Sequence, residues 1–119
     1  MEYELFVTLD IIQPIPTLNK LYRTNKHNII YKSADAKLFD SYIKTTFKQD
    51  NVFDGKMKLD ITFYINRDSD IDSKLKVLLD AFQDVIYVND IQIYEITVRK
   101  ELVKGKSNVK TIIKFYKHT

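Results

Sequence analysis

The chain has 119 residues, of which 45% are hydrophobic, and this is the size and composition of one compact domain with a single core. It contains no cysteine, which excludes disulfides, thiolate nucleophiles and cysteine-based zinc sites. The formal net charge of +3 is compatible with nucleic-acid binding, although many proteins of this charge bind no nucleic acid.

The chain carries no signal for export or membrane insertion. No apolar run approaches the length of a transmembrane helix, and the acidic start, MEYELFVTLD, is unlike a signal peptide. No repeat, low-complexity tract or domain boundary interrupts the sequence. We therefore expect a cytoplasmic protein without a membrane partner and with a single domain over residues 1–119.

The first segment predicts a half-buried strand over residues 3–11, because apolar side chains recur at every second position. Its apolar face consists of Tyr3, Leu5, Val7, Leu9 and Ile11. Pro14 and Pro16 end the strand, since proline cannot donate to a ladder.

Residues 17–27 are predicted to form a loop in which Lys20, Tyr22, Arg23 and Lys26 interleave basic and aromatic side chains. Such a loop can contact phosphates and stack on bases. The alternative is an ordinary solvated surface loop.

The middle of the chain predicts a strand, a helix and a second strong strand. A short strand is expected at residues 29–31, and Ser33 is a plausible N-cap for a helix over residues 34–48. One apolar stripe of that helix is assigned to the core: Leu38, Phe39, Tyr42, Ile43 and Phe47. Alternating apolar residues over residues 57–65 then predict a strand that leads directly into an acidic cluster.

The C-terminal half predicts a helix and two strands. Apolar residues spaced three and four apart from Ile71 to Val85 are typical of an amphipathic helix. Residues 91–103 and 109–115 are predicted to form a hairpin that closes the sheet. We expect an α+β domain with two helices packed on one mixed or mainly antiparallel sheet.

Asp68, Asp70 and Asp72 gather where the second helix is predicted to begin. Neighbouring carboxylates repel each other, and a hard divalent cation such as Mg²⁺, which prefers oxygen ligands, would offset that repulsion. The alternative is structural: Asp70 as an N-cap, Asp72 as a favourable first-turn acid, and Asp72 with Lys76 as a surface ion pair.

This stretch resembles the RusA-type Holliday junction resolvases of phages and prophages. Those proteins have a D-x-D-N-x-x-K helix start, then L-x-D-A, an aromatic residue, and D-D-x-Q-[IV] leading into a strand. The matching residues here are Asp70, Asp72, Lys76, Leu78, Asp80, Ala81, Tyr87, Asp90, Gln92 and Ile93. The chain departs from the pattern at Ser73, where the family has Asn, and at Asn89, where the family has the first Asp.

The resemblance implies a Mg²⁺-dependent endonuclease that resolves four-way DNA junctions by paired nicks, within a bacterial or phage-infected cell. It implies that Asp70, Asp72 and Asp90 converge to hold Mg²⁺. Lys76 would stabilise the phosphate charge or position the attacking water. Asp80 also matches the pattern. It either supports the site from behind the metal ligands or is an ordinary solvated acid, and we favour the second interpretation.

The family also implies DNA contacts and a homodimer. Asn19, Tyr22 and Arg23 fit the family pattern of the first loop. The full set of predicted DNA contacts is Asn19, Lys20, Tyr22, Arg23, Lys26, Lys32 and Arg67. For the dimer interface, the sequence offers Val77 and Ala81 as exposed apolar residues, and the final strand as an open edge.

Two other functions remain open at this point. Asn89 and Ser73 alter the family pattern, so a non-catalytic DNA-binding protein on the same scaffold is the first alternative. The second is a protein-interaction module, since a small basic domain can serve that role.

Overall fold

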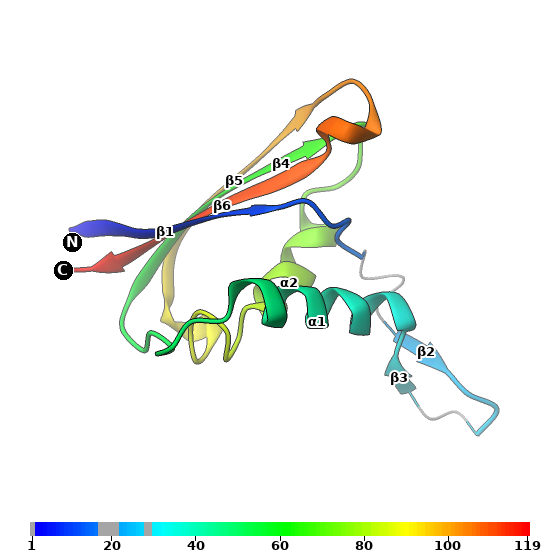
Figure 1. The fold of residues 1–119 in the computed structure, drawn as a ribbon, viewed down its shortest axis with the longest axis horizontal. Helices are drawn as coiled ribbons and strands as arrows, with labels where there is room; N and C mark the ends of the chain where they lie inside the picture. The colour runs from blue at the N-terminus through cyan, green and yellow to red at the C-terminus, as the bar shows by residue number, and fades with distance from the viewer. Residues whose placement is uncertain (1, 17–21, 28–29) are drawn as a thin grey trace.

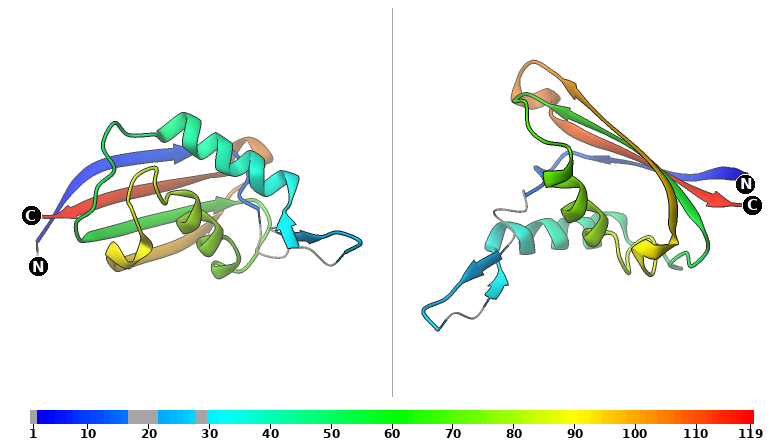
Figure 2. Two further views of the ribbon diagram at one scale, coloured as in Figure 1. Left: turned by 90° about the horizontal axis from the view of Figure 1, so that it is seen from below. Right: turned by 180° about the vertical axis from the view of Figure 1, so that it is seen from behind.

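The computed structural model describes residues 2–16, 22–27 and 30–119. Its strands and α-helices are β1 (Tyr3–Ile11), β2 (Tyr22–Thr24), β3 (Ile30–Lys32), α1 (Ala34–Phe47), β4 (Met57–Ile65), α2 (Asp72–Ala81), β5 (Ile93–Leu102) and β6 (Lys110–His118). Two short 3₁₀ turns, η2 (Asp90–Gln92) and η3 (Lys106–Asn108), precede β5 and β6. The predicted α+β class is confirmed: β1, β6, β4 and β5 form one mixed sheet, and both helices cover the same face of it (Figures 1 and 2).

The predicted hairpin of the last two strands is wrong. β6 lies between β1 and β4 and runs antiparallel to both, whereas β5 pairs in parallel with the other side of β4. Alternation in a sequence fixes which face of a strand is buried but does not select the neighbouring strand. The final strand is therefore central, and the edges of this sheet are β1 and β5.

The core lies between the sheet and the helices. The apolar positions of β4 are all buried, as predicted, and Ile113 and Phe115 of β6 join them. Ser33 caps α1, because its Oγ accepts a hydrogen bond from the Ala36 amide at 3.2 Å. Leu38 was predicted to belong to the apolar stripe of α1, but its side chain is 70% exposed.

Helix α2 is shorter than its apolar pattern predicts. It ends at Ala81, and the chain turns through Asp84, whose φ of 62° is incompatible with a continuing helix. Phe82 and Val85 are nevertheless buried in the core, which explains why their spacing imitates another helical turn.

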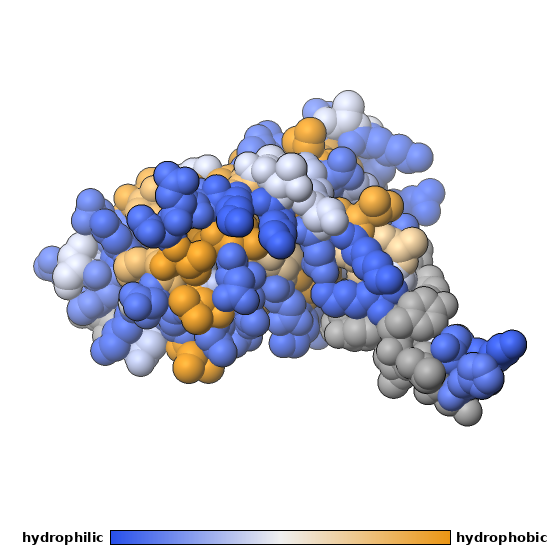
Figure 3. All heavy atoms as spheres, turned by 60° about the horizontal axis from the view of Figure 1, so that its bottom comes forward, coloured by the Kyte–Doolittle hydropathy of each residue, from blue (hydrophilic) through white to orange (hydrophobic). Residues whose placement is uncertain are grey.

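Two further local predictions require correction. A bulge between Leu5 and Val7 in β1 shifts the strand register, so Leu5 is 47% exposed while Phe6 packs against Phe53. Residues 22–24, predicted as loop, pair with β3 as the strand β2. This two-stranded arm projects from the body of the molecule (Figures 1 and 2), and its tip is hydrophilic (Figure 3).

The predicted interface residues on α2 are buried in the monomer itself. Val77 is 3% exposed and Ala81 is 8% exposed, because both face the sheet. They are therefore unavailable to a partner. Among the described residues, no helix is long and apolar enough to span a membrane.

Replacing Leu78 of α2, which is fully buried, should leave a cavity between helix and sheet. We expect Leu78→Ala to lower the free energy of unfolding by about 2–5 kcal/mol in urea denaturation. Leu38→Ala on α1 is the matched control and should change the free energy by less than about 0.5 kcal/mol, because Leu38 is exposed. Equal losses in the two variants would contradict this placement of α2.

Candidate active site

The acidic loop that joins β4 to α2 is held by a lysine from the edge strand. Lys100 Nζ donates to Asp68 Oδ1 at 2.7 Å and to the carbonyl of Ser69 at 2.9 Å. The hydrogen bond and positive charge of Lys100 lower the pKa of the Asp68 carboxyl. Asp68 is thus neutralised within the chain, and Lys100 ties the loop that carries Asp70 to the sheet.

Helix α2 begins without a side-chain cap from Asp70. The N-cap position is occupied by Ile71, which provides no side-chain cap, while Ser73 Oγ donates to the backbone carbonyl of Asp70 at 2.9 Å. The structural reading of Asp70 as an N-cap is therefore wrong. Ser73 performs a local structural task at the position where the family has Asn.

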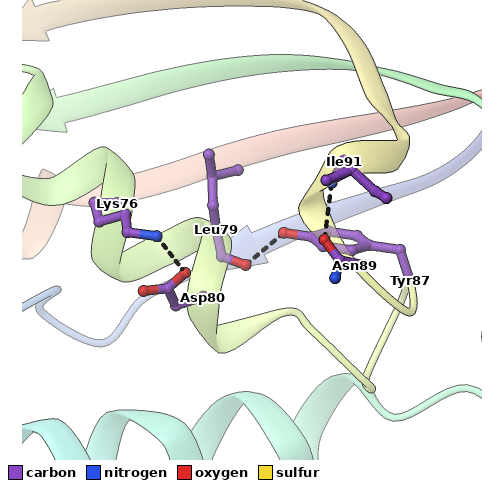
Figure 4. Close-up of polar contacts among 6 residues, drawn as sticks. All are labelled: Lys76, Leu79, Asp80, Tyr87, Asn89 and Ile91. Carbon is purple, nitrogen blue, oxygen red and sulfur yellow. Dashed lines mark hydrogen bonds and ion pairs between the residues drawn. The ribbon is translucent and has the colours of Figure 1, made fainter.

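Lys76 and Asp80 form the i, i+4 pair of α2. Lys76 Nζ lies 3.0 Å from Asp80 Oδ1 (Figure 4), and the two side chains are 57% and 40% exposed. An exposed i, i+4 pair of this kind contributes about 0.3–0.5 kcal/mol, so breaking the contact with Asp80 costs little.

Tyr87 connects the far end of α2 to the turn before β5. Its ring is fully buried, and its hydroxyl donates to the Leu79 carbonyl (Figure 4). Burial, followed by the negative charges of Asp90 and Asp80, raises the pKa of this hydroxyl. Tyr87 therefore remains a neutral hydrogen-bond donor, with Asp80 and Asp90 both near its hydroxyl end.

Asp90 opens the turn η2, and its neighbour Asn89 caps that turn. Asn89 Oδ1 accepts from the Ile91 amide at 3.0 Å (Figure 4), which is a task that an aspartate could perform equally. Replacing the family's Asp by Asn89 therefore removes a negative charge and retains the cap.

The acids of this region fall into two groups. Asp68 and Asp80 are paired with lysines, whereas the carboxylates of Asp70, Asp72 and Asp90 make no ion pair or hydrogen bond with any residue that the structure describes. Within the described ranges, no group of three or more His, Cys, Asp or Glu side chains is arranged to hold a metal ion. The convergence of the three aspartates on one ion therefore stays a prediction.

The topology explains why these aspartates are apart in one chain. Asp70 and Asp72 follow the end of β4, whereas Asp90 precedes β5, whose first residue Ile93 lies beside Met57 at the start of β4. Asp80, which shares the surroundings of Tyr87 with Asp90, is about 12 Å from Asp72 along α2 at a rise of about 1.5 Å per residue. The two acidic positions thus lie toward opposite ends of α2.

Comparison with known families assigns the chain. The family model described as endodeoxyribonuclease RusA matches residues 12–114, which include all the elements from β2 to β5 and the first part of β6. The chain belongs to the RusA endodeoxyribonuclease family. No curated protein sequence matches it.

The donor set of the RusA chain suits a hard divalent cation. Asp70, Asp72 and Asp90 offer carboxylate oxygens, and Mg²⁺ usually takes one or two protein carboxylates while keeping several waters. Within the part of the chain that the structure describes, these three carboxylates make no ion pair, which is compatible with such a role.

Three of the predicted DNA contacts lie among the described residues: Lys26 and Lys32 on the arm, and Arg67 in the acidic loop. Lys26 is exposed at the tip of the arm, and Arg67 is exposed beside Asp68. Lys32 lies 2.5 Å from Asp40 of α1, so phosphate would compete with that carboxylate. Asn19 and Lys20, and the side chains of Tyr22 and Arg23, lie outside the described residues, and these contacts stay predictions.

The structural roles of two residues around the candidate site were not predicted from the sequence. Lys100 gives no signal in the sequence, because its partner Asp68 is 32 residues away. Gln92 belongs to the D-D-x-Q pattern and so could have been singled out, but only the folded chain shows what its amide contacts.

The pairing of Asp68 with Lys100 should be visible in a titration. Because Lys100 lowers the pKa of Asp68 below its ordinary 3.8, the pair stabilises the folded state above that pH, and the contribution is lost as the pH falls through the lower pKa. We expect Lys100→Met to raise the pKa of Asp68 toward its ordinary value, measured from the carboxyl carbon by NMR. Lys104→Met, an exposed lysine of the following turn, should leave it unchanged. An unaltered Asp68 titration in Lys100→Met would refute the contact.

Proposed function

We propose that this protein is a Mg²⁺-dependent endonuclease that resolves four-way DNA junctions by paired symmetric nicks in recombination and repair. Membership of the RusA family supports endonuclease activity on DNA. The observation that carries the proposal is the electrostatic sorting of the acids: among the residues that the structure describes, the carboxylates of Asp70, Asp72 and Asp90 have no ion-pair or hydrogen-bond partner, whereas Asp68 and Asp80 are paired with lysines.

In this proposal, Asp70, Asp72 and Asp90 hold the metal. When bound, Mg²⁺ would neutralise charge on the scissile phosphate and favour ionisation of water. Lys76 lies one turn beyond Asp72 and forms an exposed ion pair with Asp80. Exchange of that carboxylate for the phosphate would place its positive charge where negative charge develops during hydrolysis.

A second copy of the chain completes the proposed site. Asp70 and Asp72 lie toward the opposite end of α2 from Asp90, so one chain presents two incomplete carboxylate sets. In a two-fold dimer, Asp90 of the partner subunit can join Asp70 and Asp72, and symmetry then generates two equivalent sites. Two sites suit a junction that is itself two-fold symmetric and that requires two nicks.

The proposed DNA contacts include basic side chains that are exposed to solvent. Lys26 and Arg67 are exposed, and phosphate binding by such groups contributes sequence-independent affinity that falls with salt. Asn19, Lys20, Tyr22, Arg23 and Lys32 complete the proposed DNA-binding set. We place the activity in the cytoplasm of a bacterial or phage-infected cell, where branched DNA arises.

Removing one proposed ligand should abolish cleavage without unfolding the chain. We expect Asp72→Asn to reduce the nicking rate of a synthetic four-way junction in Mg²⁺ by about 100-fold or more, because the metal is lost from the phosphate. Asp84→Asn makes the same charge change at an exposed residue whose positive φ suits Asn, and it should cleave like the wild type. Wild-type cleavage by a folded Asp72→Asn protein would remove Asp72 from the site. A wild type that cleaves no branched DNA would defeat the proposed function.

The shared site can be tested by mixing two inactive variants. Asp72→Asn and Asp90→Asn homodimers should both be inactive, but a co-expressed mixture should regain single nicks at about a quarter of the wild-type frequency, because each mixed dimer contains one intact site. If all three aspartates acted within one chain, the mixture would be as inactive as its components. A monomeric wild type in sedimentation at assay concentration would also contradict the arrangement.

A further inference from the structure

Gln92 makes an unusual number of contacts for a half-buried side chain. Its amide nitrogen donates to the carbonyls of Phe53 and Gly55, each at 2.9 Å. Its amide oxygen accepts from the backbone amides of Val88 and Asn89, also at 2.9 Å. These four hydrogen bonds use both donors and both acceptor sites of the primary amide.

No other common side chain can replace this pattern. The two N–H groups face two carbonyls and the oxygen faces two N–H groups, so only one orientation of the amide satisfies all four contacts. A carboxylate of the same length would keep the acceptor and lose both donors. An apolar residue would leave four backbone groups without this partner.

Residues 53–55, whose carbonyls accept the hydrogen bonds of Gln92, are themselves held by further contacts. The Phe53 amide donates to the Ile86 carbonyl at 2.9 Å, and the Phe53 ring packs against Phe6 of β1. A Cβ added at Gly55 would lie 2.7 Å from that ring, so the backbone approaches the aromatic side chain as closely as only glycine allows. Residues 53–55 therefore form a fixed support at the start of β4.

Asp90 stands between backbone groups that these contacts immobilise. Gln92 holds the amide of Asn89 on one side, and the Asn89 side chain holds the amide of Ile91 on the other. The Asp90 carboxylate makes no ion pair or hydrogen bond with the described residues, so the conformation of the turn is the main constraint on where this carboxylate lies.

We propose that Gln92 is the positioning residue of Asp90: it fixes the turn from which that carboxylate reaches the metal. This inference rests on the proposed function of Asp90. Gln92 itself contacts neither metal nor DNA in this scheme, so its loss should affect metal use and turnover more than junction binding.

The decisive variant is Gln92→Met, which keeps the length of the side chain and removes the amide. We expect its kcat on a four-way junction to fall by about tenfold or more, and the Mg²⁺ concentration for half-maximal rate to rise by a similar factor, as for other groups that orient metal ligands. KM for the junction should stay within about twofold of the wild-type value, because DNA contacts are unchanged. The matched control is Gln49→Met, since Gln49 is also half-buried but makes one amide contact, to Phe47 at the end of α1.

A folded Gln92→Met protein with the wild-type kcat and Mg²⁺ response would overturn the proposal, as would a loss confined to KM. If Gln92→Met does not fold, Gln92→Glu provides the same test, because it retains the acceptor for Val88 and Asn89 and loses only the contacts to Phe53 and Gly55. We expect the same rise in the Mg²⁺ requirement for that variant, and an unchanged requirement would refute the role.

A second readout separates failure of this inference from failure of the proposed function. Mg²⁺ titration of the Asp90 carboxyl carbon by NMR needs no catalysis. We expect Gln92→Met to require about tenfold more Mg²⁺ for half of the shift change, and faster hydrogen exchange at Val88 and Asn89. Unchanged Mg²⁺ binding at Asp90 despite faster exchange would show that the four hydrogen bonds of Gln92 serve only the structure of the turn, and would overturn the inference. An inactive wild type would count against the nuclease proposal.

Discussion

Parallel pairing of β4 with β5 is the constraint on which the arrangement of the candidate site depends. Two adjacent parallel strands need a crossover that returns the chain to the starting end of the sheet, and α2 provides it. The residues before α2 therefore leave the end of β4, and the residues after α2 arrive at its beginning. Asp72 and Asp90 are separated for this reason, and a symmetric partner becomes part of the proposed chemistry.

The acidic residues of this region differ in whether a lysine pairs with them. Lys100 of the edge strand β5 forms an ion pair with Asp68, and Lys76 forms one with Asp80, so two of the negative charges are compensated within the chain. Both pairs are exposed and contribute little to stability. Among the described residues, the carboxylates that remain without an ion pair in this region are those of Asp70, Asp72 and Asp90. The neutral phenol of Tyr87 links the end of α2 to the turn that carries Asp90.

Most of the local structure follows from the sequence, because burial imposes a period on each element. The alternation of β4 and the cap at Ser33 appear as predicted. The errors arise where the period carries no information or imitates another structure. The alternation of β6 does not show that its neighbours are β1 and β4, and not β5 as predicted. Phe82 and Val85 continue a helical spacing through a turn. Motif spacing identified the acids, but the distances between them depend on strand order, which no residue pattern here encodes.

Gln92 and its supports at Phe53 and Gly55 are separated by 39 and 37 residues in the sequence. The turn that carries Asp90 is therefore organised only after a long loop has closed, and loop closure is among the slower events of folding. Asp70 and Asp72, by contrast, belong to a local helix start. In the proposed scheme, Asp90 is therefore the ligand whose placement depends on a contact between segments far apart in the sequence, whereas the other two ligands, Asp70 and Asp72, lie within three residues of each other at the start of α2.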